Sequence, residues 1–91
     1  MVYLPIKKVW FDMIVKGEKL EEYRAITPRY SKIFDKAKDQ DNKFWCIIRN
    51  GYRKYSPSAK MLVSLSVGYG KEKWGATPGE KYFVLSILKV E

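Results

Sequence analysis

The sequence predicts a small α+β fold in which a strongly curved, mixed β-sheet closes, or nearly closes, into a barrel. Its 91 residues provide one domain, residues 1–91, with a single core. Apolar runs of strand length recur along the chain and predict about five or six strands. Only two short helical patterns are present, both in the first half, which differs from the regular strand–helix alternation of a parallel sheet. Closure into a barrel would protect the edges of such short strands.

Local patterns assign the elements in chain order. Strands are expected at residues 2–8, 18–26, 43–51, 61–70 and 81–90, and helices at 9–17 and 27–37. Pro5 confines the first strand to an edge or a bulge, because proline has no N–H to donate to a neighbouring strand. Gly17 can end the first helix in the left-handed conformation. Thr27 is a good N-cap for the second helix, and Pro28 suits its first turn.

The C-terminal strands are identified by their apolar patterns. The run FWCII predicts a strand that is buried on both faces, and the Asn50–Gly51 pair after it offers a turn. One face of the following strand would carry Met61, Val63, Leu65, Val67 and Tyr69. The glycine-rich segment 71–79 predicts a loop that carries Trp74 over the core or over the mouth of a cleft. A phosphate-binding P-loop is not expected there, because no helix follows the glycines.

Composition excludes several classes of chemistry. The chain has no histidine, which removes Ser-His-Asp and Cys-His catalysis and most zinc and iron sites. Its one cysteine, Cys46, lies within an apolar run and is expected to pack in the core. No apolar run approaches the roughly 18 residues needed to cross a bilayer, and no signal peptide is evident. We therefore expect a cytoplasmic protein with no membrane association, no metal and no cofactor, whose oligomeric state the sequence leaves open.

The net charge of +8 is unevenly distributed. Residues 42–71 contain no acidic residue. The basic residues of this span are Lys43, Arg49, Arg53, Lys54, Lys60 and Lys71, and its aromatic residues are Phe44, Trp45, Tyr52, Tyr55 and Tyr69. Basic and aromatic side chains together suit a polyanion whose bases can stack, which indicates a nucleic acid. The alternative is a soluble basic surface with the aromatic side chains in the core.

Residues 16–24, KGEKLEEYR, carry charges into an expected strand. By the two-residue period, Leu20, Glu22, Arg24 and Ile26 share one face of that strand. If this face points inward, its charges must pair with one another or line a wet cavity. Lys19 lies at the entry to the strand. The alternative is an exposed edge strand whose charges prevent aggregation.

The stretch GEKLEEYR resembles the G-x-K-x-x-E-x-R signature of the ASCH domain family, whose barrel is similar to the PUA RNA-binding fold. The matching positions are Gly17, Lys19, Glu22 and Arg24. The surrounding segments WFDMIVKG, IIRNGY and VGYGKEKWGATPGEKYFVLSI also look like small bacterial and phage members. The likeness spans Leu4 to Ile87. It implies a PUA-like barrel that binds RNA or a nucleotide in a basic cleft containing the signature.

The resemblance also implies an enzymatic alternative. Some ASCH proteins are ribonucleases, and one branch resembles amidohydrolases that deacylate N4-acetylcytidine with a lysine, a threonine and a glutamate. Leu20 and Glu22 occupy the positions of the two threonines of that branch. Loss of the second removes the hydroxyl nucleophile, so little deacylation is expected. If the protein is an enzyme, Lys19 and Glu22 would be its catalytic residues and would share proton transfer.

We therefore expect an RNA- or nucleotide-binding module. Its candidate ligand-binding residues are Lys19, Glu22, Arg24, Arg49, Asn50, Arg53, Lys54, Tyr69 and Trp74. A nucleoside hydrolase should instead have a closed pocket of base size. A third hypothesis, a module that binds a host protein, should show an exposed apolar patch.

Overall fold

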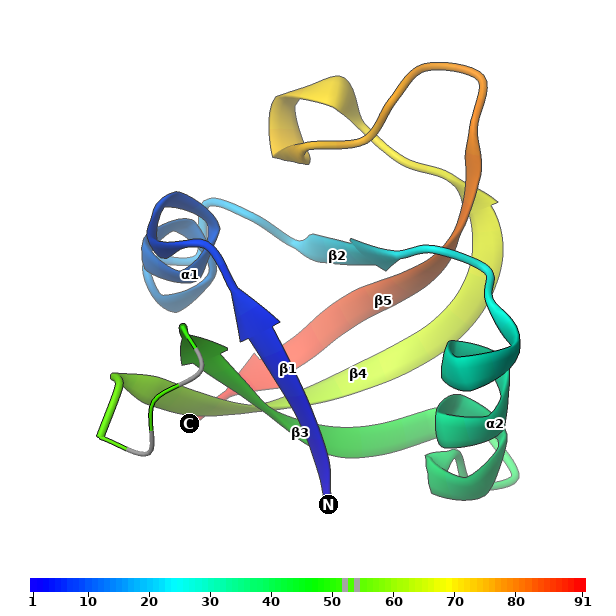
Figure 1. Ribbon diagram of the computed structural model, residues 1–91, viewed down its shortest axis with the longest axis horizontal. Coiled ribbons are helices and arrows are strands. Elements are labelled where there is room, and N and C mark those ends of the chain that lie inside the picture. Colours follow the sequence, from blue (N-terminus) through cyan, green and yellow to red (C-terminus); the bar gives the residue numbers. More distant parts are fainter. Residues whose placement is uncertain (52, 54) are drawn as a thin grey trace.

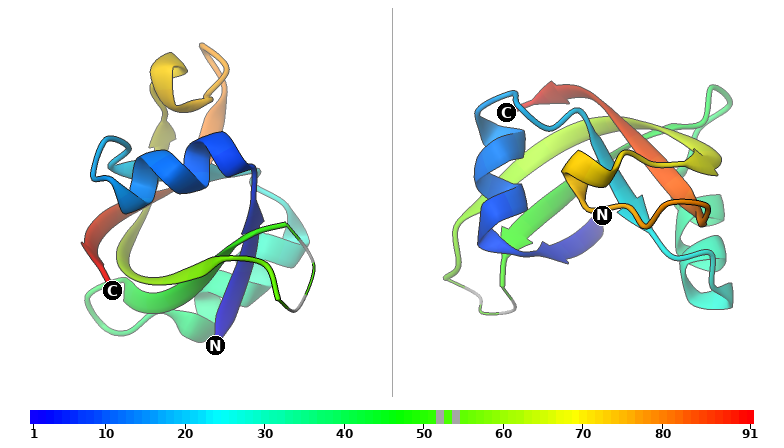
Figure 2. Two further views of the ribbon diagram at one scale, coloured as in Figure 1. Left: turned by 90° about the vertical axis from the view of Figure 1, so that its left-hand side faces the viewer. Right: turned by 90° about the horizontal axis from the view of Figure 1, so that it is seen from above.

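The computed structural model describes residues 1–51, 53 and 55–91. In chain order its elements are β1 (Val2–Ile6), α1 (Lys8–Val15), β2 (Glu21–Arg24), α2 (Pro28–Ala37), β3 (Lys43–Asn50), β4 (Ser58–Tyr69), the short 3-10 helix η1 (Glu72–Trp74) and β5 (Lys81–Val90). The strands form one sheet in the order β1-β3-β4-β5-β2. The β1–β3 pair is parallel and the other pairs are antiparallel. The sheet curls into a half-barrel, with α1 and α2 at opposite ends (Figures 1 and 2), so the predicted small α+β fold is confirmed.

The first strand lies at one edge of the sheet, where Pro5 can be accommodated because it needs no hydrogen-bonding neighbour on its free side. Helix α1 follows and buries Phe11 and Ile14 against the sheet. Gly17 ends this segment with φ 79°, the left-handed conformation that was predicted. Its N–H donates to the Ile14 carbonyl at 3.1 Å. The chain thereby turns sharply into β2.

Strand β2 is shorter than the predicted strand and forms the other edge of the sheet. It pairs only with β5, from Glu21 opposite Ser86 to Arg24 opposite Phe83. Leu20 and Ile26, which were predicted to share a strand face with Glu22 and Arg24, lie outside the strand and are 53% and 47% exposed. The turn after α1 and the start of α2 bound this strand on both sides, which leaves room for four paired residues.

Helix α2 begins as its cap predicts and anchors an aromatic cluster. The Thr27 hydroxyl accepts a hydrogen bond from the Tyr30 N–H at 3.2 Å. Phe34 is fully buried, and its ring centroid lies 5.4 Å from that of Tyr30, 5.5 Å from Phe44 and 5.2 Å from Phe83. Offset and edge-on aromatic pairs of this kind add to the stabilisation from burial. The cluster attaches α2 to the end of the half-barrel.

Strand β4 is the longest strand, and its length explains why two of its large side chains are exposed. Its residues 61–64 pair with both β3 and β5, and there Met61 and Val63 are fully buried. Beyond Ser64 it pairs with β5 alone, and Val67 and Tyr69 are 57% and 64% exposed. The two-residue period placed them on the same face as Met61 and Val63, but at this end the strand extends past the core. A register shift at Leu62/Val63 marks an irregularity of the kind that increases sheet twist.

The hydrophobic core fills the concave side of the sheet. Its buried members are Leu4, Ile6, Phe11, Ile14, Phe34, Phe44, Cys46, Ile48, Met61, Val63, Phe83 and Leu85. Cys46 is fully buried among them, and burial raises the pKa of its thiol to about 12. Two charged residues, Lys19 and Glu22, are also buried. Across the described ranges, no helix combines the length and apolar character that crossing a membrane requires.

Candidate functional site

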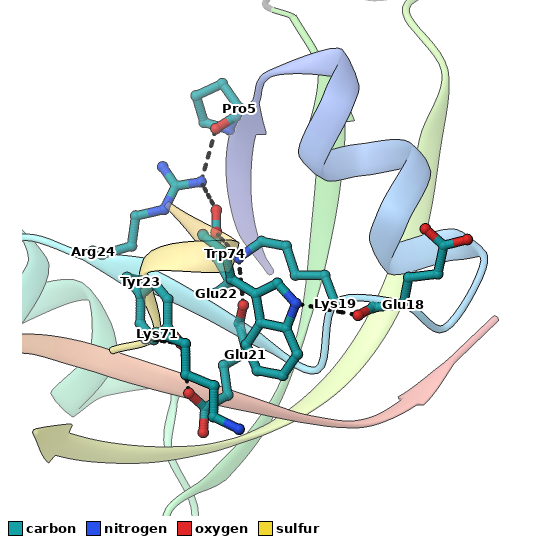
Figure 3. Close-up of polar contacts among 9 residues, drawn as sticks. All are labelled: Pro5, Glu18, Lys19, Glu21, Glu22, Tyr23, Arg24, Lys71 and Trp74. Atoms are coloured by element: carbon teal, nitrogen blue, oxygen red, sulfur yellow. Dashed lines mark hydrogen bonds and ion pairs between the residues drawn. The ribbon is translucent and has the colours of Figure 1, made fainter. Parts of the chain in front are cut away.

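The turn after α1 delivers Lys19 into the interior. The backbone N–H groups of Glu18 and Lys19 both donate to the Met13 carbonyl, at 2.8 and 3.1 Å. The side chain of Lys19 is completely buried, and Figure 3 shows it directed toward Glu22. An ionised ammonium is costly to bury without partners. The geometry around Lys19 must therefore supply acceptors for its hydrogens.

Three acceptors surround the Lys19 ammonium. It donates to the Glu21 carbonyl and to the Trp74 carbonyl, the latter at 3.1 Å. It also lies 3.2 Å from Glu22 Oε1 in an ion pair. An ammonium has three hydrogens, so this set of acceptors matches its donors. One lysine thus connects β2 to the η1 segment, which is 55 residues away in sequence.

Two aromatic rings complete the environment of this ammonium. Lys19 Nζ lies 5.4 Å from the centroid of the Trp10 ring and 5.0 Å from that of Tyr23, within cation–π distance. Burial lowers the pKa of Lys19, and the neighbouring Glu22 carboxylate opposes part of that shift. Lys19 therefore acts on its surroundings mainly by orienting Glu22 and Trp74.

The Glu22 carboxylate is shared between two cations. Its Oε1 pairs with Lys19, and its Oε2 accepts a hydrogen bond from Arg24 Nη2 at 2.7 Å. The side chains of Glu22 and Arg24 are 8% and 13% exposed. Ion pairs with so little contact with water hold their geometry more firmly than surface pairs, which contribute little. The two residues are on one face of β2, as their spacing predicts.

The Arg24 guanidinium also connects the two edges of the sheet. Its Nη2 donates to the Pro5 carbonyl of β1 at 2.8 Å, and its Nη1 donates to the Tyr30 hydroxyl at 3.2 Å. Burial alone would lower the pKa of Arg24, but the Glu22 carboxylate and the Tyr30 hydroxyl raise it above its ordinary value. Arg24 Nε is buried and has no hydrogen-bond partner among the residues described. The guanidinium thus keeps donors beyond those used inside the protein.

A pocket of about 220 Å³ opens beside Glu22 and Arg24. Its lining is contributed by β1, α1, β2, η1 and β5: Pro5, Ile6, Lys7, Trp10, Glu22, Tyr23, Arg24, Trp74, Gly75 and Tyr82. The rings of Tyr23 and Tyr82 are 5.7 Å apart. The pocket therefore combines aromatic side chains with the Glu22 carboxylate, the Arg24 guanidinium and the side chain of Lys7.

The η1 segment packs closely against this pocket. Trp74 is 6% exposed, and its indole N–H donates to the Glu18 carbonyl at 3.2 Å. Gly75 has φ 97°, and a Cβ there would lie 3.1 Å from Trp10 Cζ2. The Tyr23 hydroxyl donates to Glu21 Oε1 at 2.6 Å and accepts from the Lys71 N–H at 2.9 Å. The glycine-rich loop is thus a structural turn that carries Trp74 onto the pocket.

Other residues predicted at the site lie elsewhere. Arg49 is placed over the Tyr3 ring, 4.8 Å from its centroid, on the outward face shared by those two residues. Asn50 ends β3 and is partly buried. Tyr69 is exposed at the end of β4, and Arg53 is exposed between β3 and β4. None of these four is on the lining of the pocket. Lys54 and Tyr52 lie outside the described residues.

Sequence patterns did not identify Trp10, Tyr23, Tyr30 and Tyr82 as part of the site. Trp10 was assigned to the apolar face of the first helix, and only its position shortly after β1 brings it to the pocket mouth. Tyr23 alternates with Glu22 and Arg24, so period two places it on the other face. It reaches the pocket because β2 is at an edge. The position of Tyr23 within residues 16–24 was the available signal for that residue, and no local signal pointed to the other three.

The fold and the pocket define the class of protein: a small curled α+β half-barrel with a buried lysine–glutamate–arginine cluster beside an aromatic pocket. Comparisons with protein-family models, with curated proteins and with solved structures found no match. The geometry of the site is therefore the basis for the functional argument.

Proposed function

We propose that the protein binds RNA or a nucleotide by accepting one unpaired nucleobase in the pocket beside Glu22 and Arg24. The observation that carries this proposal is the pocket itself, with its aromatic side chains and its paired charges. Its volume of about 220 Å³ is below the roughly 300–1,000 Å³ of pockets for drug-sized ligands. A planar base is a fragment of suitable size.

The aromatic lining supplies the affinity in this proposal. Trp10, Tyr23, Trp74 and Tyr82 come from different segments of the chain and border one space. Stacking of a base on an aromatic side chain contributes about 1–3 kcal/mol. The close approach of Gly75 to the Trp10 ring keeps this lining in place.

The charged pair supplies selectivity. A carboxylate accepts hydrogen bonds from exocyclic amino groups, and a guanidinium donates to ring nitrogens and carbonyl oxygens. Each oxygen of Glu22 already accepts one hydrogen bond or ion pair and retains capacity for another. Bases with an exocyclic amino group should therefore bind better than uracil, whose O4 would oppose the carboxylate. Lys19 orients Glu22 without reaching the ligand.

We also propose that the chain is an ASCH-type domain, and the geometry supports this with a role for each signature position. Gly17 ends α1 in the left-handed conformation. Lys19, Glu22 and Arg24 form one connected chain of ion pairs at 3.2 and 2.7 Å. A signature with these spacings is what such a cluster requires, because the residues at i and i+2 share a face and the lysine precedes the strand.

The test measures binding of nucleoside monophosphates by titration calorimetry. Cytidine and adenosine monophosphates should bind the wild type more tightly than uridine monophosphate. Trp10→Leu should weaken binding by about 1–3 kcal/mol, because one stacking surface is removed. Tyr55→Leu is the control, since Tyr55 is 92% exposed and is not on the lining of this pocket. Equal effects of the two substitutions, or no binding of any monophosphate, would refute the proposal.

The hydrolase alternative predicts release of cytidine from N4-acetylcytidine. Lys19 would have to give up a hydrogen that is already directed at one of three acceptors, and its side chain is completely buried. Glu22 stands in place of the hydroxyl nucleophile. We therefore expect little or no cytidine in a chromatographic assay. Turnover that disappears in Lys19→Ala would favour the enzyme instead.

A further inference from the structure

A second and larger depression lies between β1 and α2, the two elements at the front and right of Figure 1. Its volume is about 910 Å³. The β1 side is formed by residues 1–5, and the α2 side includes Arg29, Tyr30, Ile33 and Lys36. We name this depression the β1–α2 groove. The pocket beside Glu22 and Arg24 is called the base pocket. Among the described residues, Pro5 and Arg24 alone line both this groove and the base pocket.

Arg24 joins the base pocket to the β1–α2 groove. Its guanidinium spans the space between β1 and α2 by donating to Pro5 and to Tyr30. A ligand that leaves the base pocket past Arg24 would enter the groove directly. The two depressions therefore meet at Arg24 and Pro5.

The groove is strongly basic. Arg29 and Lys36 are seven residues apart on α2, which places them on the same side of the helix, and Lys43 follows at the start of β3. Together with Arg24 they bring four cationic side chains to the lining. Asp39 is the one acidic residue on it, and its Oδ1 accepts from the backbone N–H groups of Asp41 and Lys43 at 2.8 and 2.9 Å.

Aromatic surface accompanies these charges. Tyr3, Tyr30 and Trp45 line the groove, and Tyr3 is 54% exposed. Alternation of cationic and aromatic side chains is typical of surfaces that follow a single-stranded nucleic acid, because cations meet phosphates while rings stack with bases. An extended apolar partner would leave these cations without counter-charges.

We propose that the β1–α2 groove holds the phosphodiester chain and neighbouring bases of single-stranded RNA, one base of which occupies the pocket beside Glu22. This inference rests on the proposed function and specifies its ligand: an oligonucleotide, in preference to a free mononucleotide. Arg29, Lys36 and Lys43 contact phosphates, and the exposed Tyr3 ring stacks with an adjoining base. The phosphate contacts therefore lie on α2 and the start of β3.

The test compares chain lengths. Cytidine and adenosine monophosphates, and the hexanucleotides hexacytidylate and hexaadenylate, are titrated by calorimetry over a salt series. At low salt the hexanucleotide should bind at least about fivefold more tightly than its monophosphate after its affinity is divided by six for its six equivalent bases, and this gain corresponds to one additional stacked base. The double variant Arg29→Gln/Lys36→Gln should abolish this gain. Its slope of log affinity against log salt should flatten by about 1.4, or roughly 0.7 for each phosphate that is no longer neutralised.

The matched control is Lys16→Gln/Lys32→Gln, which removes the same charge. Both residues are exposed, Lys32 is also on α2, and neither lines the groove. The control should keep the gain and the slope, and both variants should bind monophosphates as the wild type does. Monophosphate binding without a hexanucleotide gain, or equal behaviour of the two variants, would overturn the groove proposal and leave the pocket proposal intact.

The remaining outcomes distinguish the groove proposal from the pocket proposal. Absence of monophosphate binding, with hexanucleotide binding that depends on Arg29 and Lys36, would support the groove and refute the base pocket. Failure of both ligands would refute both proposals. Hexaglutamate is titrated in parallel as a probe for an acidic protein segment. Suppose that hexaglutamate binds, that its binding requires Arg29 and Lys36, and that the hexanucleotides do not bind. The groove is then a protein-docking surface, and the RNA proposal is wrong.

Discussion

Lys19 shows at the residue scale how a buried charge is accommodated in this small core. Its ammonium hydrogens meet two carbonyl oxygens and one carboxylate oxygen, and two aromatic rings lie within cation–π distance. Removing one partner of such a cluster leaves the others buried without compensation, which is more costly than losing an exposed pair. The residue is therefore expected to matter for stability as well as for the orientation of Glu22.

Lys19→Met should lower the free energy of unfolding by about 3–5 kcal/mol, because Glu22 and two carbonyl oxygens lose their shared donor. Lys8→Met is the matched control. Lys8 pairs with Asp12 at 2.6 Å, but the side chains are 74% and 40% exposed, so its loss should cost at most about 1 kcal/mol. Urea denaturation measures both. Equal costs would show that the Lys19 cluster is not a stabilising unit.

Cys46 leads to a prediction about pH. Burial raises the pKa of its thiol from 9.0 to about 12, so above pH 9 the unfolded chain releases a proton that the folded chain retains. The free energy of unfolding should therefore fall between pH 9 and 12, by up to about 1.4 kcal/mol per pH unit from this group. Cys46→Ala removes that contribution.

Two neighbours of the pocket modify this dependence. Burial and the hydrogen bond to Glu21 raise the pKa of Tyr23 from 10.0 to about 12, which also lowers stability as pH rises. Lys19 makes the opposite contribution to the pH dependence of the unfolding free energy. Its pKa is lowered, so as pH rises the folded chain releases this proton before the unfolded chain does, which raises stability. The readout is therefore the difference in slope between wild type and Cys46→Ala in urea denaturation from pH 8 upward. Parallel curves would contradict the prediction.

At the scale of elements, the segment from the end of β4 to η1 is held against β2 by close backbone packing. Gly70 follows β4, and a Cβ on it would lie 2.6 Å from Cζ of Tyr23 and 2.6 Å from Cβ of Ala76. Tyr23 is in turn fixed by Glu21 and Lys71. The position of η1, and of Trp74 within it, depends on this absence of a side chain.

Gly70→Ala should destabilise the fold by about 1–3 kcal/mol, as overpacking of a close contact does, and should weaken monophosphate binding by displacing Tyr23. Gly68→Ala is the control, because no atom lies within 4 Å of its Cβ position and the residue is within β4. That substitution should be neutral or slightly stabilising. Thermal unfolding and calorimetry provide the two measurements. A Gly70→Ala protein as stable as Gly68→Ala would refute the packing argument.

At the scale of the whole molecule, basic residues suited to phosphate contacts lie at two opposite ends of the sheet. The β1–α2 groove lies at the α2 end of the sheet. The acid-free span contributes Lys43 to that groove at the start of β3, but the end of β3 and the start of β4, which also belong to the span, are at the other end of the sheet (Figure 1). Arg53 lies between those two strands, and its carbonyl accepts from the Ser56 N–H at 3.0 Å.

Arg53→Gln should therefore leave the salt slope for hexacytidylate unchanged, because the phosphates are expected at the α2 end. Fluorescence anisotropy with a labelled oligonucleotide over a salt series measures the slope. A flattening by about 0.7 would instead place a phosphate at Arg53. The acid-free span would then be the phosphate surface that the charge pattern of the sequence predicts.

The sequence by itself determined those features that depend on neighbours along the chain. Apolar runs and alternation located the strands, Thr27 and Gly17 marked helix ends, and the spacing of Glu22 and Arg24 placed both side chains on one face. The prediction that FWCII is buried on both faces was wrong, because burial alternates along β3 and only one of its faces meets the core. These are local consequences of backbone geometry, so one segment at a time suffices to derive them.

Tertiary structure decided the exposure of strand ends and the composition of the pocket. Leu20 and Val67 are apolar and fit the two-residue alternation, yet both are exposed. Leu20 lies outside β2, which has only four residues, and Val67 lies on the part of β4 that extends beyond the end of its pairing with β3. Trp74 meets Lys19 across 55 positions in sequence, and Arg24 meets Pro5 across 19. Such contacts depend on strand order and on the curl of the sheet. No local pattern encodes them, because the secondary-structure propensity of a residue does not depend on which distant residue it contacts.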